Sequence, residues 1–474
     1  MLSLLFIAPL VLSLCVWIFR TRAFFNAALL IHAGVMLSVP ASLYFQIGSA
    51  GLPGWASPYF HADSLSLFFL GIMTLVYAAS AIYSVNYFQH SPFDFKREAI
   101  YTVSLILFTT AMAAAILSTH LAFFWVFLEL TTLCSAVLIY HDRTKSALEA
   151  TWKYIFICSI GITLAFVGIV LLSLGSREIG SLFINDLTQH ADKIHPALLK
   201  IAFAFILVGF GTKIGVAPIH AWLPDAHSEA PSPISALLSG TLLNTALIGF
   251  MRFYQIIGHT DAAAFARTIV LGVGSLTLLI SAAFMLRTIN YKRLLAYSSI
   301  ENMGIIFIGL GLGEPALYAV MLHTAAHSFA KTGLFLTSGN ILHAYGSRLV
   351  ADVKGLLKRS PVTGWLWLIL FFAISGMPPF PIFFSKWMLI QACYNQSIWL
   401  TVLFLLLLLI AFGGMAGSIM RMVFGDEESP FETSVRFAGG TTLPQIALIV
   451  LSLVIGLSMP DSIRAFLEQA AMIP

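Results

Sequence analysis

Charged residues are what this sequence has least of. Only 10% of its 474 residues are Asp, Glu, Lys or Arg, whereas 59% are hydrophobic. Soluble globular domains carry about 25% charged residues, and a chain of this length can bury a large core without losing charge from its surface. The missing charge therefore indicates a surface that faces lipid. It excludes a soluble enzyme, a disordered protein and a nucleic-acid-binding protein.

Cysteine and cofactor motifs are also scarce. The four cysteines lie in apolar segments without Cys-x-x-Cys spacing, so we expect no disulfide framework, zinc site or iron–sulfur site. There is no Walker A loop, no Gly-x-Gly-x-x-Gly unit after a strand and no haem motif. We expect no metal and no cofactor in this chain. Any ATP hydrolysis or redox chemistry must come from another subunit, so whether the chain is part of an enzyme is left open.

Long apolar runs are what the sequence has instead. A bilayer core about 30 Å thick takes about 20 apolar residues per helix, and the sequence offers fourteen such runs. We predict an all-α polytopic membrane protein with about 14 transmembrane helices in one domain over 1–474, because the longest polar connection is only 176–199. The expected helices are 1–19, 24–47, 64–87, 100–118, 121–140, 154–175, 197–221, 233–257, 267–287, 294–313, 316–344, 362–393, 398–424 and 441–460.

Basic residues are divided unevenly between the loops of the two faces. Sixteen of the 25 Lys and Arg residues fall opposite the N-terminus, Lys292 among them, and six fall on the N-terminal face. Because basic loops favour the cytoplasm, we expect an inner-membrane protein with both termini on the periplasmic side. The remaining three lysines, Lys213, Lys331 and Lys386, fall inside predicted helices.

Two of the predicted helices are interrupted. Gly and Pro residues break the seventh helix over 211–218 and the twelfth over 375–381, and a lysine stands near each break. Discontinuous helices at corresponding places in two halves indicate inverted repeats with an ion site near the midplane of the membrane. The alternative is that proline is simply tolerated in membrane helices.

Ionisable residues inside the predicted helices mark candidate functional positions. A charged side chain at a helix centre costs at least about 2.5 kcal/mol to insert, so it is kept where a bundle buries it and uses it. Glu129 lies mid-helix, and Lys213 and Lys386 lie beside the breaks. The alternatives are a Glu129 carboxyl held neutral by threonine hydroxyls, and lysines that extend to the membrane interface.

The eleventh predicted helix carries a ladder of polar side chains. His323, His327 and Lys331 are spaced by four residues, which keeps them on one face over a rise of about 12 Å. No carboxylate or thiolate accompanies them, so we expect no metal site. Because imidazole titrates near neutral pH, the ladder favours a proton relay, with histidines that bond backbone carbonyls as the alternative. Glu301, five helices after Glu129, is a possible counterpart of that residue.

The residues around the first break resemble a known family. The run from Gly211 to His227 is similar to the seventh-helix motif of the antiporter-like subunits of respiratory complex I and their relatives. Residues 290–304, 323–331 and 384–387 resemble the family's tenth, eleventh and twelfth helices. Within the family, the chain most resembles component F of the hydrogenase-4 and formate hydrogenlyase group, in residues 128–132, 149–157, 228–233 and 298–302.

The resemblance implies a fold and a route for protons. Helices 1–3 (1–99) and helix 14 (441–460) would flank two inverted five-helix repeats, helices 4–8 (100–257) and helices 9–13 (267–424). Many family members have a lysine in helix eight, where Asn244 stands here and could only order water. The expected proton axis contains Glu129, Lys213, His323, His327, Lys331 and Lys386, with Glu301, Asn244, His220, Asp225 and His227 as further candidates.

Three functions follow from these features. The leading one is a proton-translocating subunit in the membrane arm of a group 4 nickel–iron hydrogenase or formate hydrogenlyase complex. Its partners would be other membrane-arm subunits, peripheral hydrogenase and iron–sulfur subunits, and lipid. The second is a cation/proton antiporter, or an inorganic-carbon uptake subunit, with the same helices and no redox chemistry. The third is a structural membrane anchor that pumps nothing, which Asn244 favours.

Overall fold

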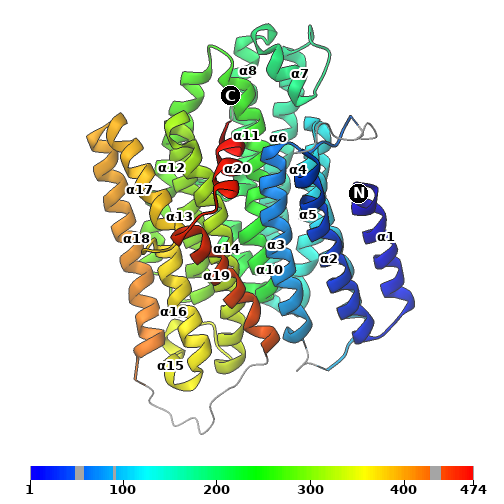
Figure 1. The fold of residues 1–474 in the computed structure, drawn as a ribbon, viewed down its shortest axis with the longest axis vertical. Helices are drawn as coiled ribbons and strands as arrows, with labels where there is room; N and C mark the ends of the chain where they lie inside the picture. The colour runs from blue at the N-terminus through cyan, green and yellow to red at the C-terminus, as the bar shows by residue number, and fades with distance from the viewer. Residues whose placement is uncertain (1, 48–57, 89–91, 427–438, 473–474) are drawn as a thin grey trace.

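Helices make up the regular structure of the described chain. The computed structural model describes residues 2–47, 58–88, 92–426 and 439–472, and in these ranges the only β pairing is three isolated bridges. Figure 1 shows the helices as one bundle, with α7 at one end and α15 at the other. The predicted all-α class is therefore confirmed.

The helices follow the predicted segments closely. Each of the fourteen predicted segments contains a helix, whereas α20 and the shorter helices α7, α9 and α15 lie outside these segments and were not predicted. The first half of the chain forms α1 Leu2–Ile18, α2 Arg22–Ile47, α3 Ser64–Tyr87, α4 Phe95–Leu117, α5 Leu121–Ile139, η1 Tyr140–Asp142, α6 Lys145–Gly175, α7 Ile184–Gln189, η2 Ala191–Lys193, α8 Pro196–Ile214, α9 Trp222–Glu229, α10 Ser232–Leu237, η3 Leu238–Leu242 and α11 Leu243–Gly258. The second half forms α12 Ala263–Met285, α13 Tyr291–Leu312, α14 Glu314–Tyr345, η4 Val350–Asp352, α15 Leu356–Arg359, α16 Pro361–Ser375, α17 Pro381–Gln396, α18 Ile398–Phe424, η5 Gly439–Thr441, α19 Leu443–Leu457 and α20 Asp461–Ala471.

The number of membrane spans is lower than predicted when each helix is taken alone. Within the described ranges, ten helices are long and apolar enough to cross a membrane, or eleven if the bent pair α19 and α20 forms one span. The long helix α14 does not qualify because the polar ladder lowers its hydropathy, and the break leaves α16 and α17 short. The count of 14 is therefore not confirmed, and the division into two inverted repeats stays a prediction.

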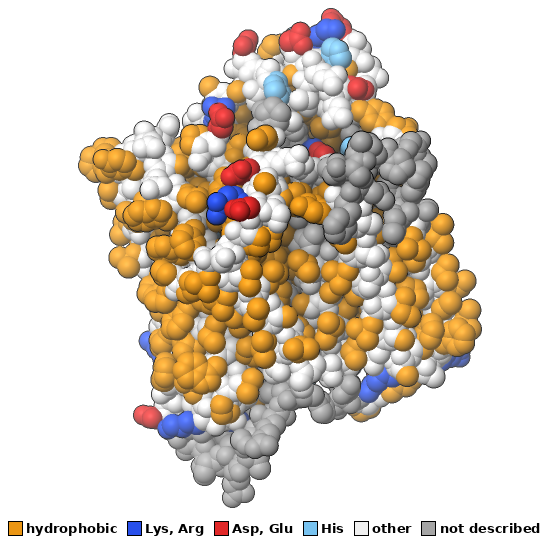
Figure 2. All heavy atoms as spheres, in the orientation of Figure 1, with side chains coloured by type: hydrophobic (Ala, Val, Ile, Leu, Met, Phe, Trp, Pro, Cys, Tyr) orange, Lys and Arg blue, Asp and Glu red, His pale blue; other side chains and the backbone are white. Residues whose placement is uncertain are grey.

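The surface and the interior of the bundle differ as expected for a multi-pass membrane protein. Figure 2 shows a broad belt of hydrophobic side chains between two ends that carry charge. The spans differ in how much of their most apolar stretch is buried inside the protein. This share is 100% for the span over 232–258 and 89% for α13, but only 28% for α18. The polar residues of α13 and α14 therefore lie at the centre of the bundle, and α18 lies at its periphery.

Both predicted breaks are present and have the same backbone hydrogen bonds. α8 ends before Gly215, at φ 84°, and the Val216 N–H donates to the Gly211 carbonyl at 3.0 Å. α16 ends before Gly376, at φ 87°, and the Met377 N–H donates to the Phe372 carbonyl at 3.1 Å. These are the long bonds of a Schellman motif, in which glycine supplies the left-handed residue.

A third irregularity was not predicted from the sequence. Between α10 and α11 the chain makes the π-helical segment η3, Leu238–Leu242. A Cβ atom on Gly240 would lie 2.5 Å from the Thr332 hydroxyl of α14, so glycine lets the two helices approach closely. Single π turns inside helices often occur at functional sites, and this one lies beside the polar ladder of α14.

Candidate functional site

Lys213 lies in the last turn of α8 and is completely buried. Its Nζ atom donates to the Thr132 hydroxyl at 2.7 Å and to the Tyr154 hydroxyl at 2.9 Å. The Tyr154 hydroxyl is in turn 2.6 Å from the Ser135 hydroxyl. The ammonium group is therefore held by neutral oxygens from α5 and α6 rather than by a carboxylate.

Glu129 of α5 is linked to Lys213 through one side chain. The Thr132 hydroxyl donates to Glu129 Oε2 at 3.1 Å and accepts the hydrogen bond from Lys213, while Ser159 donates to Glu129 Oε1 at 3.0 Å. Thr132 is three residues after Glu129, so the two side chains share a face of α5. Among the described residues, no ion pair within 4.0 Å joins Lys213 to Glu129 directly. The predicted pair is thus brought together, but with a hydroxyl between its members.

Lys386 and Glu301 form the second pair, and here the contact is direct. Lys386 Nζ lies 3.5 Å from Glu301 Oε1, and only 11% and 8% of the two side chains are exposed. Lys386 also donates to the Ser375 carbonyl at 3.2 Å, at the C-terminal end of α16. A cation is favourable there because the helix leaves its last carbonyls unpaired and partly negative. The second break therefore has its expected lysine beside it, and the contact of this lysine with Glu301 was not predicted from the sequence.

The ladder on α14 is buried along its whole length. His323 contacts Ser385 through Nδ1 and Asn302 through Nε2, both at 2.9 Å, and Lys331 donates to the Leu295 carbonyl at 2.7 Å. His327, by contrast, finds no hydrogen-bond partner for either ring nitrogen in the part of the chain that the structure describes. Buried polar atoms without a protein partner are the usual sites of internal water.

Asn244 contacts α14 at Ser328, which is the residue after His327. Its amide nitrogen donates to the Gly240 carbonyl at 3.0 Å and to the Ser328 hydroxyl at 2.7 Å, and its Oδ1 atom has no partner in the described ranges. Nothing titratable stands at this position. Within the described part of the chain, no hydrogen bond joins Asn244 to the cluster around Lys213. Direct bonds between protein groups therefore do not span the distance between the two lysine sites.

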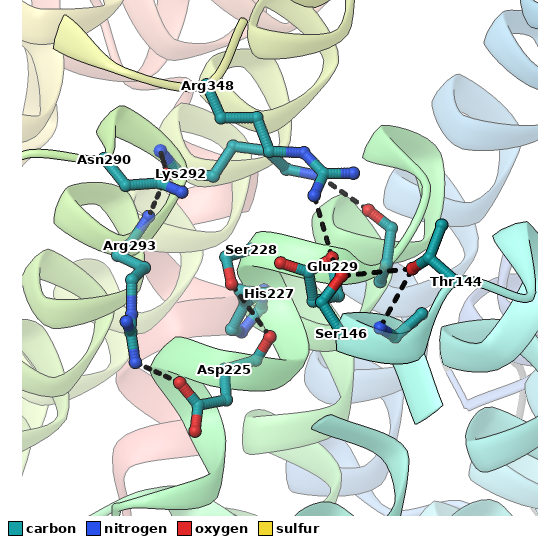
Figure 3. Close-up of polar contacts among 12 residues, drawn as sticks. Thr144, Ser146, Asp225, His227, Ser228, Glu229, Asn290, Lys292, Arg293 and Arg348 are labelled. Atoms are coloured by element: carbon teal, nitrogen blue, oxygen red, sulfur yellow. Dashed lines mark hydrogen bonds and ion pairs between the residues drawn. The ribbon is translucent and has the colours of Figure 1, made fainter. Parts of the chain in front are cut away.

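The remaining three candidates lie around the first break. His220 stands between α8 and α9, and its Nδ1 atom has no partner. Asp225 forms ion pairs with Lys153 of α6 and Arg293 of α13 near one end of the bundle, as Figure 3 shows in part. His227 is completely buried, with its ring stacked on that of Phe335 at 4.8 Å. Among the described residues, no hydrogen bond or ion pair joins any of the three to Lys213 or Lys386.

A lysine that the sequence analysis assigned to a loop is buried in a helix. Lys292, expected in a loop, lies in the first turn of α13, is completely buried, and donates to the Ala230 carbonyl at 2.6 Å. The reason is that Asn290 caps the helix by accepting from the Lys292 N–H, so α13 begins at Tyr291 instead of 294. Asparagine is a strong N-cap residue, and it was the signal in the sequence that could have identified this start.

Partner side chains were also missed. Tyr154 and Ser135 around Lys213, and Asn302 and Ser385 around His323, are ordinary polar residues with no distinctive spacing. Only the three-dimensional packing identifies them. The described residues contain no group of three His, Cys, Asp or Glu side chains placed to hold a metal ion.

At the end of the bundle that carries α7, one ion pair connects α3 and α11. Arg252 donates to both oxygens of Asp63, at 2.5 and 2.6 Å. Burial would raise the pKa of the Asp63 carboxyl, but the Arg252 guanidinium lowers this pKa to about 2. The pair therefore stays ionised over the whole physiological pH range and links the start of α3 to α11.

The comparisons with known proteins agree with this geometry. The chain is 31% identical over 432 residues to the hydrogenase-4 component F homolog of Methylacidiphilum infernorum, a match that covers 88% of each chain. It is 26% identical over 461 residues to a Na(+)/H(+) antiporter protein of Bacillus subtilis, covering 96% of this chain and 91% of that protein.

A solved structure has the same fold. A chain of the membrane-bound sulfane sulfur reductase, an archaeal respiratory membrane complex, matches with a TM-score of 0.88 at 23% identity, over 99% of this chain and 97% of that chain. The family model of the NADH:quinone oxidoreductase/Mrp antiporter transmembrane proteins matches residues 118–412, which include both breaks, Glu129 with Lys213, and Glu301 with Lys386. This chain is therefore a member of the NADH:quinone oxidoreductase/Mrp antiporter transmembrane family.

Proposed function

We propose that this chain is a proton-translocating subunit in the membrane arm of a redox-driven complex of the group 4 hydrogenase and formate hydrogenlyase type. The observation that carries the proposal is the environment of Lys213. A buried ammonium held only by hydroxyl oxygens, with a carboxylate one hydroxyl away, can exist with or without its proton. A fixed ion pair would hold the proton permanently.

The chemistry at this site is a proton exchange controlled by Glu129. Burial disfavours the charged lysine, and a nearby carboxylate favours it. While Thr132 connects the two, Lys213 keeps its proton. Once the Glu129 side chain turns away, the ammonium loses its nearest negative charge and gives the proton to water at the break, where the end of α8 leaves carbonyl groups to order it.

The second pair supports a transfer of charge from one half of the chain to the other. Lys386 contacts Glu301 directly, whereas Lys213 contacts Glu129 through Thr132. One lysine–glutamate pair is therefore in direct contact in this structure, and the other is not. His327 and Asn244 have polar atoms without a partner among the described residues, and water bound to them would connect the two pairs.

The energy and the partners come from outside the chain. We expect no redox centre in it, so the peripheral hydrogenase and iron–sulfur subunits of the complex would drive it. Glu129 is only partly buried, and exposed apolar residues such as Leu133 and Phe156 surround it. A carboxylate facing lipid is unfavourable. This face of α5 and α6 would therefore meet another membrane-arm subunit, in an inner membrane with both termini on the periplasmic side.

A cation/proton antiporter is the second candidate. The match to the Bacillus subtilis Na(+)/H(+) antiporter protein over 96% of this chain favours it. It would use the same buried pairs without redox chemistry, driven by an ion gradient. Proton movement that requires an opposing sodium gradient, and no electron donor, would identify this function.

The test begins with the complex as the cell makes it. The tagged chain is purified in mild detergent, its partners are identified by mass spectrometry, and the complex is placed in proteoliposomes with internal pyranine to report pH. We expect nickel–iron and iron–sulfur subunits and proton movement driven by the electron donor. Lys213→Met should assemble but move no protons, and Lys213→Arg should fail as well because arginine does not deprotonate.

The matched control is Lys200→Met, which removes an exposed lysine from the same helix, α8. It should leave proton movement unchanged. Near-normal pumping by Lys213→Met would refute the proposal. An assembled wild-type complex that moves no protons under either driving force would instead identify the chain as a structural anchor.

A further inference from the structure

Lys292 and His227 form a buried basic pair that the proposed route does not use. Both side chains are completely buried. They lie at the end of the bundle where α9 and α13 meet, and Figure 3 shows them with the charged residues Asp225, Glu229, Arg293 and Arg348. Burying such groups costs free energy unless they are satisfied, so their hydrogen bonds indicate what else the site holds.

The hydrogen bonds of Lys292 are incomplete. An ammonium group has three N–H donors, and the acceptor that the described residues provide is the Ala230 carbonyl, at 2.6 Å. No carboxylate of the described chain lies within ion-pair distance of it. The open donors therefore need an acceptor that the described residues do not supply, and water commonly takes that role at buried polar sites.

The hydrogen bonds of His227 are also incomplete. Neither of its ring nitrogens has a hydrogen-bond partner among the described residues, although His227 is fully buried. The ring is stacked on Phe335 at 4.8 Å and an interplanar angle of 15°, which fixes its plane but satisfies no polar atom. An imidazole in this position can accept a proton on one nitrogen and release one from the other.

The pair continues the ladder of α14 toward the end of the bundle. Phe335 is four residues after Lys331, so it occupies the next position on the face that carries the ladder. Lys331 donates to the Leu295 carbonyl, and Leu295 is three residues after Lys292 on α13. That is a rise of about 4.5 Å along the helix. His227 and Lys292 are therefore the next polar positions beyond Lys331.

On its other side the pair reaches groups that contact solvent. Glu229, two residues after His227, accepts from Arg348 at 2.8 Å and from Ser146 at 2.9 Å. Both members of the Glu229–Arg348 pair are partly exposed, at 16% and 27% of their side chains. This end of the bundle carries most of the basic loops. The charged groups that act on Lys292 from neighbouring elements are Arg348, Asp142 and Glu229, with Lys331 beyond His227.

We propose that Lys292 and His227 form the entry station through which protons pass from the face with the basic loops to Lys331. This proposal rests on the proposed function. A proton from solvent near Glu229 is taken up by the neutral amine of Lys292 through water. Lys292 then releases a proton to water at His227, and Lys331 takes one from the same water, so that one proton enters and one moves on.

The test replaces Lys292 in the intact complex and measures proton uptake into pyranine proteoliposomes between pH 5 and 9. Lys292→Met and Lys292→Arg should each lower the rate by at least about 100-fold, which is the lower limit for a positioned proton-transfer group. Lys292→His should restore uptake, with its alkaline limit at lower pH because imidazole has a lower pKa than an amine. Lys96→Met, which removes an exposed lysine of the same face, is the control.

The outcomes separate this proposal from the proposed function. If Lys213→Met stops proton uptake and Lys292→Met does not, only the entry station is wrong. If Lys292→Arg restores uptake and Lys292→His does not, Lys292 supplies charge and no proton, which also overturns the entry station. If the assembled wild-type complex moves no protons, both proposals fail.

Discussion

The Lys213 ammonium is connected to the Glu129 carboxylate by a single hydroxyl group. Thr132 accepts from Lys213 at 2.7 Å and donates to Glu129 at 3.1 Å. In the second half of the chain, Lys386 Nζ lies 3.5 Å from Glu301 Oε1, without a bridging side chain. A hydroxyl can donate one hydrogen bond while it accepts another, so Thr132 joins the two charged groups without a direct contact between them.

Thr132→Val should therefore slow proton movement without preventing assembly. Valine keeps the shape of threonine but removes the acceptor of Lys213 and the donor to Glu129. A hydrogen bond to a charged group contributes about 1.5 to 3 kcal/mol, which corresponds to a loss of about 10- to 150-fold if the bond is needed in the slow step. The measurement is the rate of pyranine acidification.

Thr132→Ser should keep most of the rate because it keeps the hydroxyl. Thr163→Val, on an exposed turn of α6, serves as the control for loss of a threonine hydroxyl in the membrane. A normal rate in Thr132→Val would mean that the bridge in the structure has no part in transfer.

Asn244→Ala should reduce proton movement only modestly. The amide holds Ser328 and leaves one oxygen for water, but it carries no proton that could be passed on. Removing it disturbs the water and leaves every titratable group in place. Comparison with Lys213→Met in the same proteoliposomes checks this prediction, and it is wrong if the two variants are equally inactive.

Gly376→Ala should disturb the second break. Gly376 has φ 87°, and a Cβ atom there would lie 3.1 Å from Cδ of Lys386. A left-handed conformation costs a residue other than glycine about 1 to 2 kcal/mol. The expected result is a lower melting temperature of the purified protein together with slower proton movement.

Gly272→Ala is its matched control, since a Cβ atom on that glycine of α12 would meet open space. This change should leave stability unchanged or raise it slightly, by up to about 1 kcal/mol. Equal melting temperatures for the two variants would show that the backbone of the break is not under this constraint.

The orientation in the membrane can be tested by cysteine labelling. With the four native cysteines replaced by serine, Asp192→Cys in the 176–199 loop should react with an impermeant maleimide added outside intact cells. Lys358→Cys, in the 348–359 loop, should react only after the cells are opened. Both positions are exposed in the structure. The opposite labelling pattern would place both termini in the cytoplasm.

Sequence reasoning located the helices and the breaks because hydrophobic runs and Gly/Pro interruptions are local signals. It located Glu129, Lys213, Lys331 and Lys386 because a charge inside an apolar run is conspicuous. It did not find Thr132 as the bridging group, because a threonine in a membrane helix is ordinary. It placed Lys292 in a loop because one basic residue near a helix end has the same pattern whether it faces solvent or the core.

The π turn between α10 and α11 has a consequence for how this gene can change in length. A π turn holds about one residue more than an α turn, so loss of one codon within 238–242 would let the segment rewind as an ordinary helix. The helices on both sides would keep their faces, and Asn244 would still face Ser328. Evolution can therefore add or remove one residue here at little structural cost. The same change would create or remove the close approach of Gly240 to α14.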